Sequence, residues 1–78
     1  MFETRDQFIA ALLFYFDIPY TGFKYVPRNE RNWVYFQFQG GAGECEELVE
    51  NYLNHNLVVD AYTYVRCLEV TKEIYRSF

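Results

Sequence analysis

A cysteine, a histidine and an aspartate are the residues of this chain that could support nucleophilic catalysis. Cys45 lies near the start of an expected helix, where the helix dipole favours a thiolate, and His55 and Asp60 could complete a Cys–His–Asp set. The neighbours argue against this chemistry, because the negative charges of Glu44 and Glu46 beside Cys45 raise the pKa of a thiol. His55 lies in a polar Asn-His-Asn turn, where a solvated side chain is the commoner case. We therefore expect no catalytic residue and a protein that is not an enzyme.

The spacing of the possible ligands fits neither a metal site nor a phosphate loop. Cys45, Cys67 and His55 show no ligand spacing such as Cys-x-x-Cys, so we expect no metal ion. The glycine-rich stretch 40–43 precedes an expected helix, and backbone amides at a helix start can hold an anion. Glutamates rather than a lysine follow these glycines, and their charge repels phosphate. We interpret the stretch as a flexible bend between a strand and a helix, and we expect no cofactor.

Cations and aromatic rings gather on an expected β-hairpin, where they suggest binding of nucleic acid. Aromatic rings that face outward beside cations are a common way to hold single strands. Trp33 and Tyr35 could instead pack under a helix, with the cations serving only to keep an exposed turn hydrated, and the sequence leaves both arrangements open. The candidate interaction surface consists of Lys24, Tyr25, Arg28, Arg31, Trp33 and Tyr35.

The net charge of −4 comes from the second half of the chain, because residues 1–43 carry as many bases as acids. An acidic total argues against long-range attraction to phosphate, although it permits a local basic patch. Such a surface could imitate nucleic-acid phosphates, as some small phage inhibitors of host systems do. A solvated outer helix face explains the same residues, and we favour that interpretation. The candidate acidic patch consists of Glu44, Glu46, Glu47 and Glu50.

The first expected helix is apolar on all sides. Thr4 and Gln7 have the spacing of a capping box, which predicts that Thr4 caps this helix, and Asp17 and Pro19 end it. An inner stripe is expected at Phe8, Ile9, Leu12 and Phe16. Other apolar residues cover the remaining sides, so the helix is either buried all round or has a partner.

The rest of the chain predicts a hairpin followed by two helices. Alternating residues over 21–26 and 33–39 indicate two antiparallel strands with a loop near 27–31. Helices are expected over 44–54 and 61–78, with Asp60 as the cap of the last one. The prediction is one small α+β domain over residues 1–78, with one antiparallel β-hairpin packed against three α-helices in the order α-β-β-α-α.

Aromatic residues make up 22% of the 78 residues, as eight Phe, eight Tyr and one Trp. A domain of this size buries only about 60% of its unfolded surface, so some of these rings are expected to face a partner. We therefore expect a non-enzymatic protein–protein interaction module, either a homodimer or a binder of an unidentified protein, with nucleic-acid binding as the alternative. The candidate self-association surface consists of Phe14, Tyr15, Val70 and Ile74.

The chain resembles an uncharacterised family of small bacterial and phage proteins over nearly its whole length. The resemblance rests on helix caps and core positions, namely Phe2, Thr4, Asp6, Ala10, Ala11, Phe36, Phe38, Leu48, Val49, Tyr52, Asp60 and Lys72. It implies the helix–hairpin–helix–helix pattern and a bacterial or phage origin, but no activity and no site residue. This chain departs from the family pattern in having Asp17 where glycine is expected, and in the glycine run before the second helix.

Cysteine usage and hydropathy predict a cytoplasmic location. Cys45 and Cys67 fall in expected helices, and we expect both to be reduced. The longest apolar run, from Phe8 to Phe16, is much shorter than the ~20 residues that cross a membrane, so no membrane partner is expected.

Overall fold

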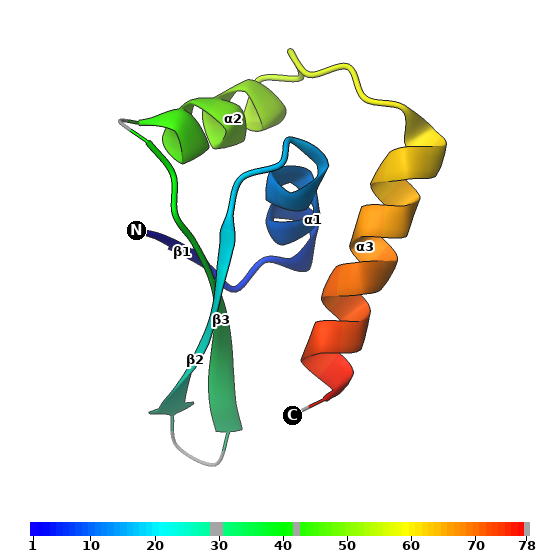
Figure 1. Cartoon of the computed structure of the whole chain (residues 1–78). Coiled ribbons are helices and arrows are strands. Elements are labelled where there is room, and N and C mark those ends of the chain that lie inside the picture. Colours follow the sequence, from blue (N-terminus) through cyan, green and yellow to red (C-terminus); the bar gives the residue numbers. More distant parts are fainter. Residues whose placement is uncertain (29–30, 42, 78) are drawn as a thin grey trace.

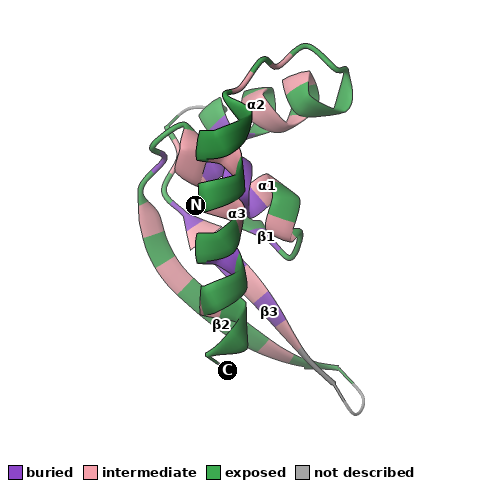
Figure 2. Ribbon diagram, turned by 90° about the vertical axis from the view of Figure 1, so that its right-hand side faces the viewer, coloured by how far each residue is buried: buried purple, intermediate pink, exposed green. Residues whose placement is uncertain are grey.

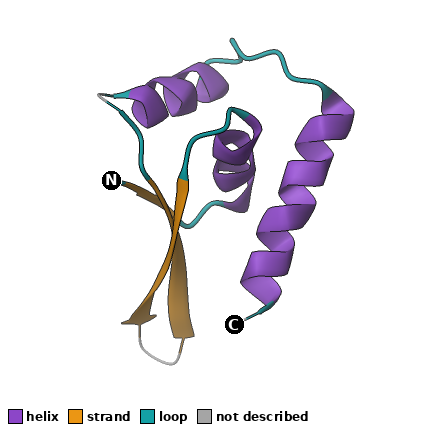
Figure 3. Ribbon diagram, in the orientation of Figure 1, coloured by secondary structure: helices purple, strands orange, loops and turns teal. Residues whose placement is uncertain are grey.

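The computed structural model describes residues 1–28, 31–41 and 43–77, without the side chains of residues 31 and 32. Its elements are β1 (Phe2–Thr4), α1 (Gln7–Tyr15), β2 (Tyr20–Arg28), β3 (Arg31–Phe38), α2 (Glu44–Leu53) and α3 (Ala61–Arg76). Figure 3 shows strands and helices in separate parts of the molecule, which confirms the α+β class. The predicted element order was incomplete, because a strand precedes the first helix.

The sheet has three antiparallel strands in the order β1-β3-β2, rather than the two strands of the predicted hairpin. β1 pairs with β3 in a register that places Phe2 opposite Phe38 and Thr4 opposite Phe36. The central strand is therefore β3, and among the described strands β1 and β2 form the two outer edges of the sheet. The expected loop near 27–31 is shorter than predicted, because Arg28 still pairs with Arg31. Positions 29 and 30 of that loop lie outside the described residues.

Three layers build the core, with α1 between the sheet and α3 (Figure 1). Ala10 and Leu13 of α1 pack with the buried rings of Phe36 and Phe38. The residues from Ala10 to Leu13 are at most 2% exposed, so α1 is covered on all sides at its centre. This explains why its sequence is apolar all round. The predicted inner stripe was wrong at its two ends, since Phe8 and Phe16 are 54% and 37% exposed.

Asp6, and not Thr4, caps the start of α1. The Asp6 carboxylate accepts hydrogen bonds from the backbone amides of Phe8 and Ile9, at 2.8 and 3.2 Å. Thr4 belongs to β1, and its Oγ1 accepts a hydrogen bond from the Asp6 amide. The predicted capping box was therefore shifted by two residues, because the sequence pattern did not show that Thr4 is held in a sheet. The predicted Asp60 cap of α3 is confirmed by a hydrogen bond from the Thr63 amide.

Helices α1 and α2 both end with a non-glycine residue in the left-handed region. Asp17 has φ 59° after α1, and His55 has φ 60° after α2. In each case the next amide reaches back to the helix, from Ile18 to the Leu13 carbonyl and from Asn56 to the Asn51 carbonyl. These contacts are those of the Schellman motif, in which glycine usually occupies the left-handed position. His55 thus has a local structural role at the end of α2.

A close contact between Gly40 and Cys45 joins the end of the sheet to α2. Cys45 is fully buried in the core cluster with Phe36 and Phe38. A Cβ placed on Gly40 would lie 2.5 Å from the Cys45 Sγ, so glycine is required for this approach. The bend predicted between strand and helix is therefore a tight packing point at Gly40.

Candidate functional site

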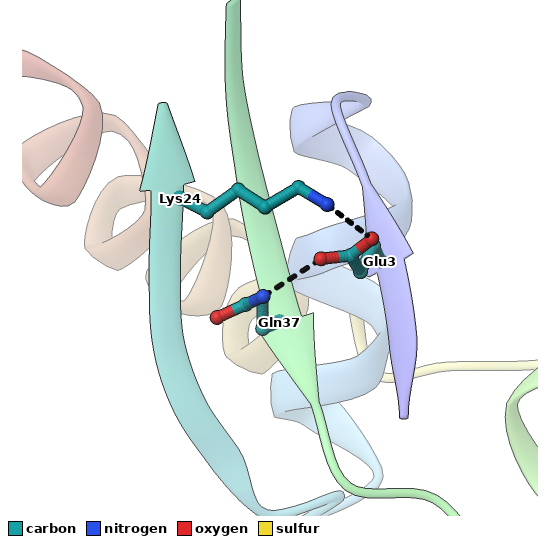
Figure 4. Close-up of polar contacts among 3 residues, drawn as sticks. All are labelled: Glu3, Lys24 and Gln37. Carbon is teal, nitrogen blue, oxygen red and sulfur yellow. Dashed lines mark hydrogen bonds and ion pairs between the residues drawn. The ribbon is translucent and has the colours of Figure 1, made fainter. Parts of the chain in front are cut away.

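One face of the sheet carries none of the described helices, and we call it the uncovered face. On β3, Val34, Phe36 and Phe38 are buried toward the helices, so Trp33, Tyr35 and Gln37 point to the opposite side. The strand register adds side chains of β1 and β2 to this side. Figure 4 shows Glu3 of β1, Lys24 of β2 and Gln37 of β3 in front of the strands, with helices behind. The uncovered face consists of Glu3, Arg5, Lys24, Val26, Arg28, Trp33, Tyr35 and Gln37.

Two guanidinium groups lie over the ring of Trp33. The Arg5 Cζ is 3.5 Å from the ring centroid, and the Arg28 Cζ is 5.0 Å from it. Both distances are within the range of cation–π attraction. Trp33 is half-buried, and the cations rather than a helix supply this cover. The arrangement that the sequence left open is thus resolved in favour of a tryptophan on the sheet surface.

Glu3 is the one carboxylate among the described side chains of the uncovered face. Gln37 donates a hydrogen bond to it, and Lys24 forms an ion pair with it. Gln37 Nε2 donates a hydrogen bond to Glu3 Oε2 at 2.7 Å, and Lys24 Nζ lies 3.0 Å from Glu3 Oε1 (Figure 4). The hydrogen bond from Gln37, followed by that from Lys24, lowers the pKa of Glu3. Lys24 also lies 5.6 Å from the centroid of the Tyr35 ring.

The residues of the predicted interaction surface lie on two opposite faces of the sheet. Lys24, Arg28, Trp33 and Tyr35 share the uncovered face, as their strand register shows. Tyr25 points to the helix side, where its ring centroid lies 5.8 Å from that of Phe23. The side chain of Arg31 lies outside the described residues.

Sequence reasoning missed Arg5 and Glu3 as members of this surface. Glu3 lies in β1 and Arg5 lies just after it, and the three residues of this strand give only a weak period-two signal. The signal that could have revealed them is the alternation of Phe2, Glu3 and Thr4, which continues to Arg5.

A second candidate surface surrounds the segment that connects α2 to α3. A pocket of about 400 Å³ opens there, and its walls come from α1, from the end of α2, from the connecting segment and from α3. Val58, between two residues that line the pocket, is 93% exposed. We call this the connector surface, and it consists of Phe8, Leu12, Tyr52, His55, Leu57, Val58, Val59 and Tyr64.

Hydrogen bonds between layers hold the connector surface in place. The Tyr64 hydroxyl donates to the Phe8 carbonyl at 2.8 Å, and burial raises the pKa of this phenol. The Asp60 amide donates to the Tyr15 hydroxyl, also at 2.8 Å. Both hydrogen bonds connect α3 to α1 next to the pocket, so the positions of the apolar residues in its wall are fixed by the fold.

The four residues of the predicted self-association surface differ in how far they are exposed to solvent. The ring of Phe14 packs against Tyr20 and Phe38, with centroids 5.2 and 5.1 Å apart. Tyr15 accepts the hydrogen bond from Asp60, and Ile74 packs against the core cluster. Val70 is 44% exposed and is the most accessible of the four. Association through this set stays a prediction, with Val70 as its exposed member.

The acidic patch and Cys45 lie on α2, whereas the other two catalytic candidates lie outside it, His55 after its end and Asp60 at the N-cap of α3. Glu44, Glu46, Glu47 and Glu50 are all exposed, and three of them are in the first turn. Burial, followed by the charges of Glu46 and Glu44, raises the pKa of Cys45. Cys45 lies in the first turn of α2 and His55 lies beyond its last residue, Leu53, which is itself about 12 Å from Cys45 along the helix axis. The two side chains therefore do not form a thiolate–imidazole pair.

The remaining described sites that could hold a small ion have few suitable ligand groups. A pocket of about 240 Å³ at Gly40, Gly41 and Gly43 is also lined by Glu46, whose charge opposes phosphate binding. Within residues 1–28, 31–41 and 43–77, no group of three His, Cys, Asp or Glu side chains is placed to hold a metal ion. Cys45 and Cys67 are both free. None of the helices described is long and apolar enough to span a bilayer.

Comparisons of the chain with models of protein families, with curated proteins and with solved structures find no match.

Proposed function

We propose that this chain is a non-enzymatic interaction module that binds a second copy of itself through the connector surface. The observation that carries the proposal is the apolar pocket of about 400 Å³, together with Val58, which is 93% exposed on the segment between the lining residues Leu57 and Val59. Contiguous apolar surface that a fold leaves exposed is typical of binding sites. A bacterial or phage origin and a cytoplasmic location, with both thiols reduced, belong to the same proposal.

The packing of α3 supports a partner on this side of the molecule. Thr71 is the one buried residue among the sixteen of this helix, and Figure 2 shows most of its surface as exposed. Tyr62 and Val65 are 70% and 49% exposed. A helix attached along a single stripe contributes little burial to so small a domain. A partner on the connector surface that also reaches Tyr62 and Val65, in the first turns of α3, would add part of the missing burial.

A second copy fits the connector surface because this surface contains both an exposed apolar side chain and a pocket that could receive it. In a two-fold dimer the same patch meets itself, so a protruding group on one protomer must find a recess on the other. Val58 is the protruding group, and the pocket between Phe8 and Tyr64 is the recess. Full burial of a valine side chain contributes about 1.5–3 kcal/mol, and the two-fold axis makes the contact twice.

The experiment is sedimentation equilibrium of the full chain from micromolar to millimolar concentration. The expected result is a rise in mass from 9.4 kDa toward twice that value, with association unchanged or stronger at higher salt. The salt effect follows because each copy carries a charge of −4, and salt screens the repulsion between copies. A mass that stays at 9.4 kDa over the whole range would contradict the proposal.

The acidic patch keeps a different hypothesis open to test. Glu44, Glu46, Glu47 and Glu50 are exposed, as an imitation of nucleic-acid phosphates requires. Negative charge in the first turn also stabilises α2 through its dipole, which explains three of these residues without a partner. An acidic inhibitor of a host system is for this reason only the second hypothesis, behind self-association.

A further inference from the structure

We propose that the uncovered face of the sheet binds single-stranded nucleic acid, with bases stacked at Trp33 and Tyr35 and phosphates held by Arg5 and Arg28. This site lies on the opposite side of the sheet from α1, so it goes beyond self-association at the connector surface and does not depend on it.

The charge of the uncovered face is opposite to that of the whole chain. Its described side chains include the cations Arg5, Lys24 and Arg28 and the single carboxylate of Glu3, whereas the chain has a net charge of −4. Lys24 is paired with Glu3. Among the described residues, the guanidinium groups of Arg5 and Arg28 have no carboxylate partner, and both arginines are exposed. Two cations without a carboxylate partner among the described residues, on one small face, are suited to neighbouring phosphates.

The geometry at Trp33 favours a base as the stacking ligand. Arg5 already lies over the indole at 3.5 Å, and guanidinium planes stack on bases as aromatic rings do. A base can therefore extend the Trp33–Arg5 stack, while Arg28 at 5.0 Å is close enough to hold the adjacent phosphate. Trp33 and Tyr35 are two residues apart on one strand, which places them about 7 Å apart, as suits adjacent nucleotides of an extended strand.

An acidic peptide is the competing ligand, and the aromatic residues argue against it. Carboxylates would satisfy Arg5 and Arg28 but would leave Trp33 and Tyr35 without a planar partner. The bases of a single strand supply such planes at every step, and stacking of this kind tolerates different sequences. The double helix also fits poorly, because its bases are already stacked and its edges require side chains that reach into a groove.

The test is a titration of dye-labelled oligothymidylate and oligouridylate, followed by fluorescence anisotropy at 50 and 200 mM salt. We expect binding that weakens steeply with salt, and an affinity about tenfold lower for Trp33→Ala, in line with the range measured for base stacking. Arg28→Ala should weaken binding and reduce the salt slope by about one phosphate contact. Tighter binding of the uridylate or of the thymidylate identifies RNA or DNA as the ligand, and both results support the proposal.

Arg66→Ala is the matched control, because Arg66 also lies over an aromatic ring, that of Tyr62 at 5.8 Å, but on α3. It removes the same charge from the other side of the molecule and should leave oligonucleotide binding unchanged. Circular dichroism of each variant verifies that the fold is intact, and Trp33→Phe, which keeps a ring, replaces Trp33→Ala if the latter unfolds. The proposal is overturned by equal losses for Arg28→Ala and Arg66→Ala, by an affinity for polyglutamate equal to that for the oligonucleotides, or by the absence of salt-sensitive binding.

Discussion

The Cζ atom of Arg5 lies 3.5 Å from the centroid of the Trp33 ring, so a residue just beyond β1 covers a ring in the middle of β3. This contact connects the first residues of the chain to the hairpin across the sheet. It also determines how far Trp33 is exposed to solvent, since none of the described helices lies on that face of the sheet.

Arg5→Ala should expose Trp33. The indole then loses the guanidinium that shields it, so its emission should shift to longer wavelength and acrylamide should quench it more strongly. The unfolding free energy should fall by about 0.5–1 kcal/mol, the usual range for an exposed cation–π pair. Trp33 is the only tryptophan, so emission reports this site alone. Arg66→Ala, which breaks the Tyr62 pair, should leave the emission unchanged, and an equal shift in both variants would contradict the Arg5 contact.

Gly40→Ala should destabilise the fold by about 1–3 kcal/mol, the usual range for overpacking a core. The new methyl group would lie 2.5 Å from the buried Cys45 Sγ, so either the Cys45 side chain or α2 must shift. Thermal or urea unfolding measures the loss. Gly41→Ala is the control and should cost much less, because nothing lies within 4 Å of that position.

A double-mutant cycle identifies the cause of this loss. Cys45→Ala removes the sulfur, so Gly40→Ala should cost less in that background than in the native chain. Strictly additive losses would show that the Gly40–Cys45 contact is not the source of the effect.

Asp17→Gly and His55→Gly should each stabilise the fold by about 0.5–1 kcal/mol. Both residues have φ near +60°, a conformation that is costly for residues with a Cβ and free of strain for glycine. The gain is reduced by the larger backbone entropy of glycine in the unfolded chain. Asn54→Gly is the control, because Asn54 has φ −89° and glycine there should bring no gain. A loss of stability in both variants would mean that their side chains contribute more than the strain costs.

The stability of the fold should fall in acid partly because of Glu3. Hydrogen bonds from Gln37 and Lys24 lower the pKa of Glu3 in the folded state. Its contribution is therefore present above the unfolded pKa of about 4.3 and is lost as the pH falls through the lower folded value. Glu3→Gln should flatten this part of the profile of unfolding temperature against pH. Gln37→Met, which removes the larger cause, should flatten it in part, and profiles parallel to that of the native chain would refute the role of Glu3.

Much of the architecture follows from local patterns in the sequence, and the differences have identifiable causes. The alternation of Val34, Phe36 and Phe38 predicts the central strand, and Asp60 predicts the start of α3. β1 was missed because three residues show too little alternation, and its stability depends on pairing with β3. The mistaken Thr4 cap followed directly, because a residue paired in a sheet does not begin the helix.

The candidate site was partly predictable for a similar reason. Residues of one strand share a face at every second position, which brings Trp33 and Tyr35 together. Which face the helices cover depends on long-range packing of Ala10 and Leu13 against Phe36, and no local pattern contains that information. The connector surface was not predicted, because its pocket joins Phe8 to Tyr64 across more than fifty positions of the chain.

Sedimentation equilibrium of the native chain beside Val58→Glu and Val70→Glu tests self-association through the connector surface most directly. Both substitutions put the same charge on an exposed valine, one on the segment that connects α2 to α3 and one on α3 itself, so neither should disturb the core. The expected result is a dimer for the native chain and for Val70→Glu, and a monomer for Val58→Glu. A dimer that survives Val58→Glu and dissociates in Val70→Glu would contradict the connector surface and assign the interface to α3.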